Sequence, residues 1–256
     1  MERCGQGVRC LPPSSYPFDI SKVHTIKAIL SVFEAGTAVA DYSAIAILKD
    51  GAGVSYGKHQ ATDGGGSLDA IVQVYVDSCG PLAGPLAPYL PRLARNETAG
   101  VDPDHLPQWV DDLVDLLRHA GRDTVMQRAQ DQVFDDRYWE PAVEQVLEMG
   151  LVDPLSWAVV YDTCIHSGPS GVWNIRKRFP GAPPSGGGCE RAWTRAFIEA
   201  RRAWLASSAN PVVRATVYRM DAFRDLEEAG NWNLDTPFVI DVQVPGSHRN
   251  LTATVP

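Results

Sequence analysis

The sequence has no apolar run long enough to cross a membrane. A transmembrane helix needs about 20 consecutive apolar residues, whereas the most apolar segments here are Ala44–Leu48 and Leu155–Tyr161. Basic residues are also few: 23 Lys and Arg stand against 31 Asp and Glu, which leaves a net charge of −8. Nucleic-acid binding requires a basic face. We therefore expect no membrane insertion and no nucleic-acid partner, and a neutral or cationic ligand suits the charge better.

Motifs for metal and nucleotide chemistry are missing. The five cysteines include no Cys-x-x-Cys pair and the histidines show no His-x-x-x-His spacing, so a zinc site is not expected. The glycine-rich segment Asp50–Lys58 lacks the Gly-Lys-Ser or Gly-Lys-Thr ending of a phosphate loop and precedes a strand rather than a helix. We expect neither a metal nor a cofactor. Cys164 lies in an apolar segment and is expected to be a buried thiol.

No secretory signal is visible at the start of the chain. Residues 1–12 lack a basic segment followed by an apolar stretch of about 7–15 residues. This is expected of a mature or shortened form, or of a protein that leaves the cell by another route. Residues 1–20, with two prolines and two serines in succession at 12–15, are expected to form an arm.

Helical periodicity dominates the rest of the chain. Apolar residues at three-four spacing predict a helix over 21–34 that ends at Gly36. Alternating residues over 42–48 and 54–58, on either side of Lys49-Asp50-Gly51, predict a β-hairpin. We predict an α+β, mainly α-helical fold with one domain (21–244) of two lobes around a cleft, followed by a tail (245–256). Further helices are expected at 67–76, 103–119, 123–134, 138–149, 154–166, 172–178, 190–206 and 211–229, and a last strand at 238–244.

Two carboxylates in unlike settings are candidates for acid–base chemistry. Glu34 ends an apolar helix, where the negative end of the helix dipole and the neighbouring Phe33 favour the protonated acid. Asp50 lies in a glycine-rich turn, where a carboxylate stays hydrated and ionised. Glycoside cleavage needs such a pair, one to protonate the leaving oxygen and one to act as base or nucleophile. The plainer interpretation is a surface residue at a helix end and an ordinary turn former.

A third carboxylate, Asp162, lies in a segment that is apolar nearly all round and is expected to be a buried helix. A buried carboxylate needs a cation or several donors. The candidate partners are Arg201 or Arg202 on one helix, and Arg214 or Arg219 on the next. The alternative is an ion pair that only positions helices. Near these motifs, Ser55 could hold a water beside Asp50, and we predict that Tyr56, His59 and His166 bind substrate.

Four groups of short motifs follow one another in a fixed order. They are Asp123-Thr-Val-Met-Gln-Arg-Ala-Gln130 with Arg137-Tyr-Trp-Glu-Pro-Ala142, Tyr161-Asp-Thr-Cys-Ile-His166 with Asn174-Ile-Arg-Lys177, Phe197-Ile-Glu-Ala-Arg-Arg202, and Ala229-Gly-Asn231. Through these motifs the chain resembles the family 46 chitosanases of the lysozyme-like superfamily, and the resemblance covers about residues 31–237.

The resemblance implies roles for the candidate residues. Glu34 corresponds to the general acid of the family and Asp50 to its general base. Ser55 stands where the family has a threonine that orients the attacking water. Asp162, Arg201 and Arg214 correspond to a polar network that links the central helix to the base. The implied reaction is inverting hydrolysis of a β-1,4 bond in an amino-sugar polymer. Separately from the resemblance, we expect a monomer.

The sequence differs from the family in the segment that would bind substrate. Ala52 replaces an arginine between two glycines, and Ser55 is followed by Tyr-Gly-Lys-His-Gln in place of a glycine-rich apolar run. This segment is similar to that of related cell-wall lysins of phages and antibacterial effectors. Chitosan and peptidoglycan therefore both remain candidate polymers, for an enzyme secreted or delivered to the wall or periplasm. A carbohydrate-binding protein without activity is the alternative of another class.

Overall fold

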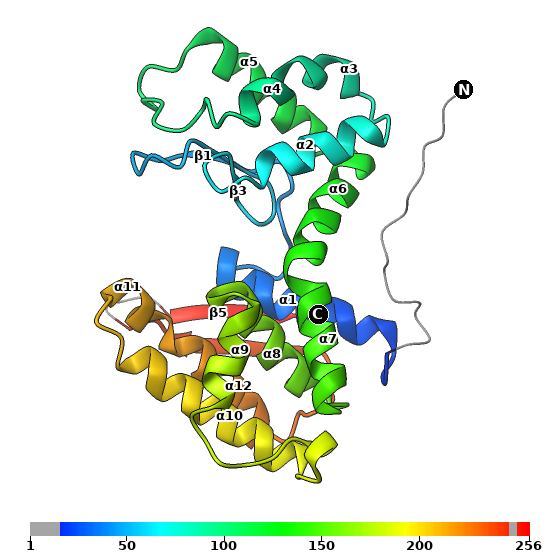
Figure 1. Ribbon diagram of the computed structural model, residues 1–256, viewed down its shortest axis with the longest axis vertical. Helices are drawn as coiled ribbons and strands as arrows, with labels where there is room; N and C mark the ends of the chain where they lie inside the picture. The colour runs from blue at the N-terminus through cyan, green and yellow to red at the C-terminus, as the bar shows by residue number, and fades with distance from the viewer. Residues whose placement is uncertain (1–15, 246–249) are drawn as a thin grey trace. The chain divides into compact units, whose positions relative to one another are not determined.

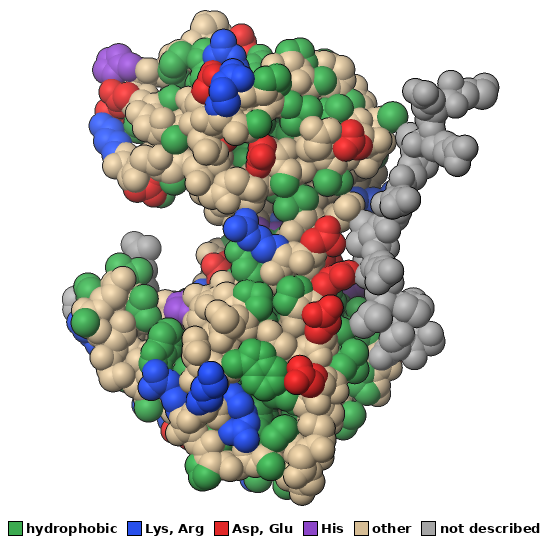
Figure 2. All heavy atoms as spheres, viewed as in Figure 1, with side chains coloured by type: hydrophobic (Ala, Val, Ile, Leu, Met, Phe, Trp, Pro, Cys, Tyr) green, Lys and Arg blue, Asp and Glu red, His purple; other side chains and the backbone are tan. Residues whose placement is uncertain are grey.

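The computed structural model describes residues 16–245 and 250–256, which form two compact units (Figure 1). In the described part, the first unit consists of Ala40–Asp136, and the second of residues 16–39 together with Arg137–Pro256. On the face drawn in Figure 2, acidic and basic side chains are interspersed with apolar ones, and no single kind covers either unit. None of the helices in the described ranges has the length and apolar character needed to span a membrane.

The first unit joins a small sheet to a group of helices. Its three strands are antiparallel in the order β1-β2-β3, with Ile45 opposite Tyr56 and Ser55 opposite Thr62. Helices α2 and α6 pack together over an apolar core that also takes in β2 and α5. The elements are β1 (Ile45–Ile47), β2 (Val54–Tyr56), β3 (Ala61–Thr62), α2 (Leu68–Asp77), α3 (Ala83–Leu86), η2 (Ala87–Tyr89), α4 (Leu90–Leu93), α5 (Gln108–Ala120) and α6 (Thr124–Phe134).

The second unit is built around a helix that is buried on almost every side. This helix, α8, packs against α1, α7, α9 and α10, as its apolar sequence predicts. A π-helical turn, η3 (Asp135–Trp139), begins at the last two residues of the first unit and precedes α7 in the chain. The other elements are α1 (Ile20–Ala35), α7 (Glu140–Met149), α8 (Pro154–Ser167), α9 (Pro169–Arg176), η4 (Pro184–Gly186), α10 (Glu190–Ala206), α11 (Pro211–Arg214), η5 (Ala215–Val217), α12 (Tyr218–Glu228), β4 (Phe238–Gln243) and β5 (Asn250–Val255).

Helix α1 has clear start and stop signals. The side chain of Asp19 accepts a hydrogen bond from the Ser21 amide at 2.8 Å and caps the first turn. Gly36 has φ of +74° and donates its amide to the Val32 carbonyl, which ends the helix in a left-handed cap. The predicted helix over 21–34 and its stop at Gly36 are confirmed.

The predicted α+β, mainly helical fold is confirmed, with differences at short or interrupted elements. The helix expected from 103 begins only after Pro107. This proline is the N-cap of α5, and its backbone is extended, with ψ of 142°. The helix expected over 211–229 is broken into α11, η5 and α12. Residues 250–255, assigned to a tail, form β5 and pair with β4 along its whole length. Of the expected arm, residues 1–15 lie outside the described residues, and Tyr16 and Phe18 pack against Trp157.

Candidate active site

Glu34 lies on the last turn of α1 and accepts a hydrogen bond from Arg219. The distance from Arg219 Nη2 to Glu34 Oε1 is 2.7 Å, and the Glu34 side chain is 38% exposed whereas that of Arg219 is 5% exposed. The Arg219 guanidinium also lies 5.6 Å from the centre of the buried Phe33 ring. The carboxylate is therefore open to solvent on one side and held by a nearly buried cation on the other.

Asp162 is fully buried on α8 and has two arginine partners. Arg219 Nη1 donates to Asp162 Oδ1 at 2.9 Å, and Arg201 Nη1 donates to Asp162 Oδ2. Burial of the carboxyl acts to raise its pKa, but the charges of Arg201 and Arg219 outweigh burial and hold the pKa of Asp162 below its usual range. Asp162 is therefore an ionised group that fixes two guanidinium groups inside the protein.

Arg219 connects this buried pair to the surface. Burial acts to lower the pKa of Arg219, and the neighbouring carboxylates of Asp162 and Glu34 outweigh it and raise that pKa. Arg219 thus stays charged, and the series Arg201–Asp162–Arg219–Glu34 is continuous through hydrogen bonds. All four residues belong to the second unit.

The structure corrects the prediction for Arg214. Arg214 is exposed at the end of α11, and its Nη1 donates to the Ser208 carbonyl at 2.6 Å. The network role belongs to Arg219, the other arginine considered for this helix. The helix is interrupted by η5 between α11 and α12, which separates these two positions, and the apolar pattern over 211–229 does not indicate that break.

Asp50 lies in the first unit, in the turn between β1 and β2. It is exposed, and its Oδ1 accepts a hydrogen bond from the Ala52 amide at 3.0 Å. The following Gly53 has φ of +77°, and a Cβ atom there would come within 2.4 Å of Thr98 Oγ1. That hydroxyl accepts from the Val54 amide and donates to the buried Asp63. The end of the turn is therefore fixed to the body of the unit while Asp50 faces water.

Ser55 lies in the middle of β2 and is nearly buried. Strand pairing places it opposite Ala46 of β1 and Thr62 of β3. The surrounding Gly53-Val-Ser-Tyr-Gly57 matches the sequence pattern of a nucleophile elbow, Gly-x-Ser-x-Gly. That motif, however, requires a turn from a strand into a helix. Ser55 is in a central strand instead, so it does not form an elbow. Its role beside Asp50 stays a prediction.

The three predicted substrate-binding residues have different surroundings. Tyr56 is fully buried and donates to the Leu117 carbonyl at 2.7 Å, so the prediction that it binds substrate is wrong: its alternation in β2 points it into the core. His59 is half-buried and stacks on Phe134 with ring centres 3.4 Å apart. His166 is half-buried, and burial, together with Arg201, lowers its pKa to about 4.

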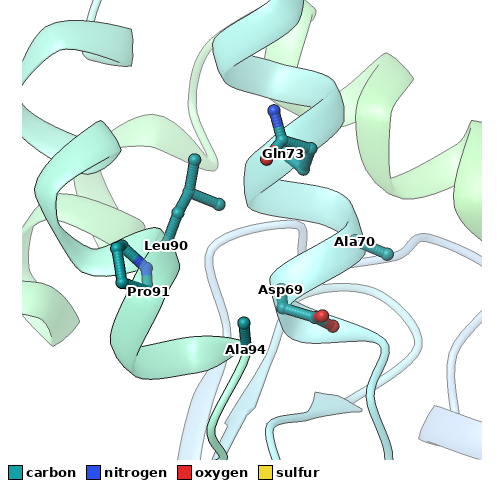
Figure 3. A pocket seen from close by; sticks show the side chains of 6 residues that line it. All are labelled: Asp69, Ala70, Gln73, Leu90, Pro91 and Ala94. Atoms are coloured by element: carbon teal, nitrogen blue, oxygen red, sulfur yellow. The ribbon is translucent and has the colours of Figure 1, made fainter.

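One hollow of the first unit is separate from these residues. It has a volume of about 390 Å³ and lies between the first turns of α2 and helix α4 (Figure 3). None of the predicted site residues lines it; its walls are Asp69, Ala70, Gln73, Leu90, Pro91 and Ala94. Within residues 16–245 and 250–256, no three His, Cys, Asp or Glu side chains are grouped as a metal site would require. The predicted buried thiol is confirmed, since Cys164 is fully buried and burial raises its pKa to about 12.

The chain has a lysozyme-like fold, which solved chitosanases share. A mutant chitosanase from Bacillus subtilis MY002, solved in complex with 6 GlcN, matches this fold with a TM-score of 0.73 and 24% identity, over 92% of this chain and 98% of that one. The model of glycosyl hydrolase family 46 matches residues 28–238, and the chain belongs to this family.

Two chitosanases are similar in sequence. The enzyme of Bacillus subtilis (strain 168) is 30% identical over 223 residues, which is 82% of this chain and 78% of that protein. The enzyme of Streptomyces sp. (strain N174) is 31% identical over 210 residues, 77% of this chain and 70% of that protein. The resemblance stated from the sequence motifs is confirmed, and the protein is a glycoside hydrolase.

Proposed function

We propose that this protein is a chitosanase that hydrolyses β-1,4 bonds of its polymer with inversion at the anomeric carbon. Glu34 donates a proton to the leaving oxygen, and Asp50, aided by Ser55, takes a proton from the attacking water. The observation that carries the proposal is the connection of Glu34, a partly exposed carboxylate, to the buried Asp162 through Arg219. Membership of family 46 and two chitosanase relatives support the chemistry.

The buried network holds the Glu34 side chain in place. In the free protein, one carboxyl oxygen of Glu34 accepts a hydrogen bond from Arg219. Asp162 carries one negative charge against the two positive charges of Arg201 and Arg219. This leaves a single excess positive charge near Glu34, which orients the carboxylate without two unbalanced cations beside it.

Chitosan is the substrate that the relatives favour. Both similar proteins are chitosanases. The net charge of −8 suits a polycation as well. We propose that residues 21–244 act as one catalytic domain, as a monomer and without a cofactor. We also place its action outside the cytoplasm, as a secreted enzyme or one delivered to the wall or periplasm.

The decisive experiment measures reducing sugar released from chitosan by the wild type, Glu34→Gln and Asp50→Asn. Both variants should keep the wild-type circular dichroism spectrum and lose at least about 100-fold in kcat, the contribution expected of a general acid or base. Arg214→Ala is the control and should stay within about twofold. NMR of the first product should show the inverted anomer.

The alternatives give different results in the same assays. Loss of turbidity from bacterial sacculi without sugar release from chitosan would favour peptidoglycan. Binding of chitosan without any hydrolysis would favour a protein that has lost its activity. A carboxylate variant with near-normal turnover would remove that residue from the mechanism.

A further inference from the structure

We propose that Tyr218 is a positioning residue for the reaction: its phenol holds the last turn of α1 and so fixes the direction of the Glu34 carboxylate. The inference rests on the proposed role of Glu34 as the acid. It concerns a residue that touches neither substrate nor reacting atoms. Tyr218 acts through the backbone of the residue before Glu34.

The phenol of Tyr218 satisfies a carbonyl that the helix itself leaves open. The last four carbonyls of a helix have no partner within it. At the end of α1, the Val32 carbonyl accepts from the Gly36 amide, and the next carbonyl, that of Phe33, accepts from Tyr218 Oη at 3.0 Å. Both Phe33 and Tyr218 are buried. A carbonyl this deep needs a protein partner, because water does not reach it freely.

Three residues of α12 contact two consecutive residues of α1. Tyr218 bonds the Phe33 backbone, and its ring meets the Phe33 ring edge-on with centres 6.0 Å apart. Phe223, one turn later, meets the same ring at 5.4 Å. Arg219 lies over that ring and donates to the Glu34 carboxylate. The backbone before Glu34, the neighbouring ring and the carboxylate itself are therefore all set by one helix.

The hydroxyl remains a donor throughout the working pH range. Burial raises the pKa of the Tyr218 phenol, and the adjacent Arg219 lowers it by less. The phenol is therefore protonated at neutral and alkaline pH. If the hydrogen bond were lost, the last turn would be free to unwind by a fraction of an ångström, and Glu34 would move with it. Displacements of about 1 Å at a reacting group can cost about 100-fold in rate.

The test is Tyr218→Phe, which keeps the ring and deletes only the hydroxyl. Reducing-sugar release from chitosan should show kcat lowered about tenfold with KM within about twofold, because the substrate contacts are unchanged. Tyr75→Phe is the matched control: it deletes a phenol that bonds Asp123 and the Leu82 amide in the first unit, and its kcat should stay within about twofold. Assays are run where circular dichroism shows both variants fully folded.

A double-mutant cycle separates positioning from general loosening. If Tyr218 acts through Glu34, Tyr218→Phe should add little to the loss already caused by Glu34→Gln. If the two losses multiply, or if folded Tyr218→Phe keeps the wild-type kcat, the inference is overturned. Should Tyr218→Phe not fold, Tyr218→His, which also lacks the phenol hydroxyl, is measured by the same criteria. Full activity of Glu34→Gln would instead overturn the proposed function, and the two failures are distinct.

Discussion

Arg219 lies 2.7 Å from Glu34 and, with its other terminal nitrogen, 2.9 Å from Asp162. One planar guanidinium thus connects a carboxylate at the protein surface to one that has no contact with water. Arginine suits this place because it offers several donors in a fixed plane and stays charged when buried. A shift of Asp162 would therefore be transmitted directly to the group proposed as the acid.

Replacing Arg219 by lysine should keep the charge but lose one of the two hydrogen bonds. A lysine ammonium is a point charge on a flexible chain and cannot span both carboxylates in one plane. We expect kcat on chitosan to fall at least about tenfold. Arg214→Lys is the matched control and should be within about twofold of the wild type, since Arg214 is exposed and donates to the Ser208 carbonyl. Equal losses in the two variants would contradict the assignment of Arg219.

Asp162→Asn should destabilise the protein strongly. The substitution removes the negative charge between two buried guanidinium groups, and Arg201 is left without a carboxylate partner while Arg219 keeps only Glu34. Removing one partner of a buried ion pair costs about 3–5 kcal/mol. Urea denaturation followed by circular dichroism measures the loss. Asp115→Asn, which removes an exposed partner of Arg118, should change the free energy of unfolding by no more than about 0.5 kcal/mol.

Stability should fall as the pH decreases from about 6.5 to about 4. Burial lowers the pKa of His166 to about 4 in the folded protein, from 6.5 when unperturbed, so the unfolded state takes up this proton first. In that window the unfolded state binds more protons, and stability rises with pH. The contribution of this residue is at most about 3 kcal/mol. Unfolding of His166→Asn, which cannot take up this proton, should show a flatter pH dependence there; an unchanged slope would contradict the prediction.

The turn that carries Asp50 should tolerate substitution at one glycine and not at the other. Gly51 and Gly53 both have positive φ, which costs an alanine about 1 kcal/mol. At Gly51 the added Cβ meets nothing within 4 Å, whereas at Gly53 it would come within 2.4 Å of Thr98 Oγ1 and 2.8 Å of the Thr98 backbone. Thermal unfolding should show a loss above about 2 kcal/mol for Gly53→Ala and about 1 kcal/mol for Gly51→Ala. Similar losses in both would mean that the Thr98 contact is unimportant.

Strong local signals account for what the sequence predicts of the fold. The start and stop of α1 follow from three-four spacing and Gly36, and the hairpin follows from alternation around Asp50-Gly51. Strand β5 was not predicted because its sequence signal is weak. Leu251, Ala253 and Val255 alternate with polar residues, and this alternation is the one feature that could have indicated a strand before its pairing with β4 is known.

The sequence alone does not tell which arginine pairs with Asp162. The burial of Asp162 and its need for a cation follow from the apolar segment around it, but several arginines satisfied that need equally well. The outcome depends on a break between α11 and α12 that no glycine marks within 211–218. The wrong prediction that Tyr56 binds substrate has a similar cause. Alternation in a short strand does not tell which face of the strand meets the core, because that depends on where the helices pack.

The residues that hold the end of α1, the helix with Glu34, come much later in the chain. Tyr218 and Arg219 each follow their partner on α1 by 185 residues, and Leu251 of β5 lies 3.8 Å from the position that a Cβ on Gly36 would occupy. During synthesis α1 leaves the ribosome well before α12 and β5 exist. A nascent chain therefore contains Glu34, the proposed proton donor, before the residues that orient it, and the complete arrangement forms late in translation.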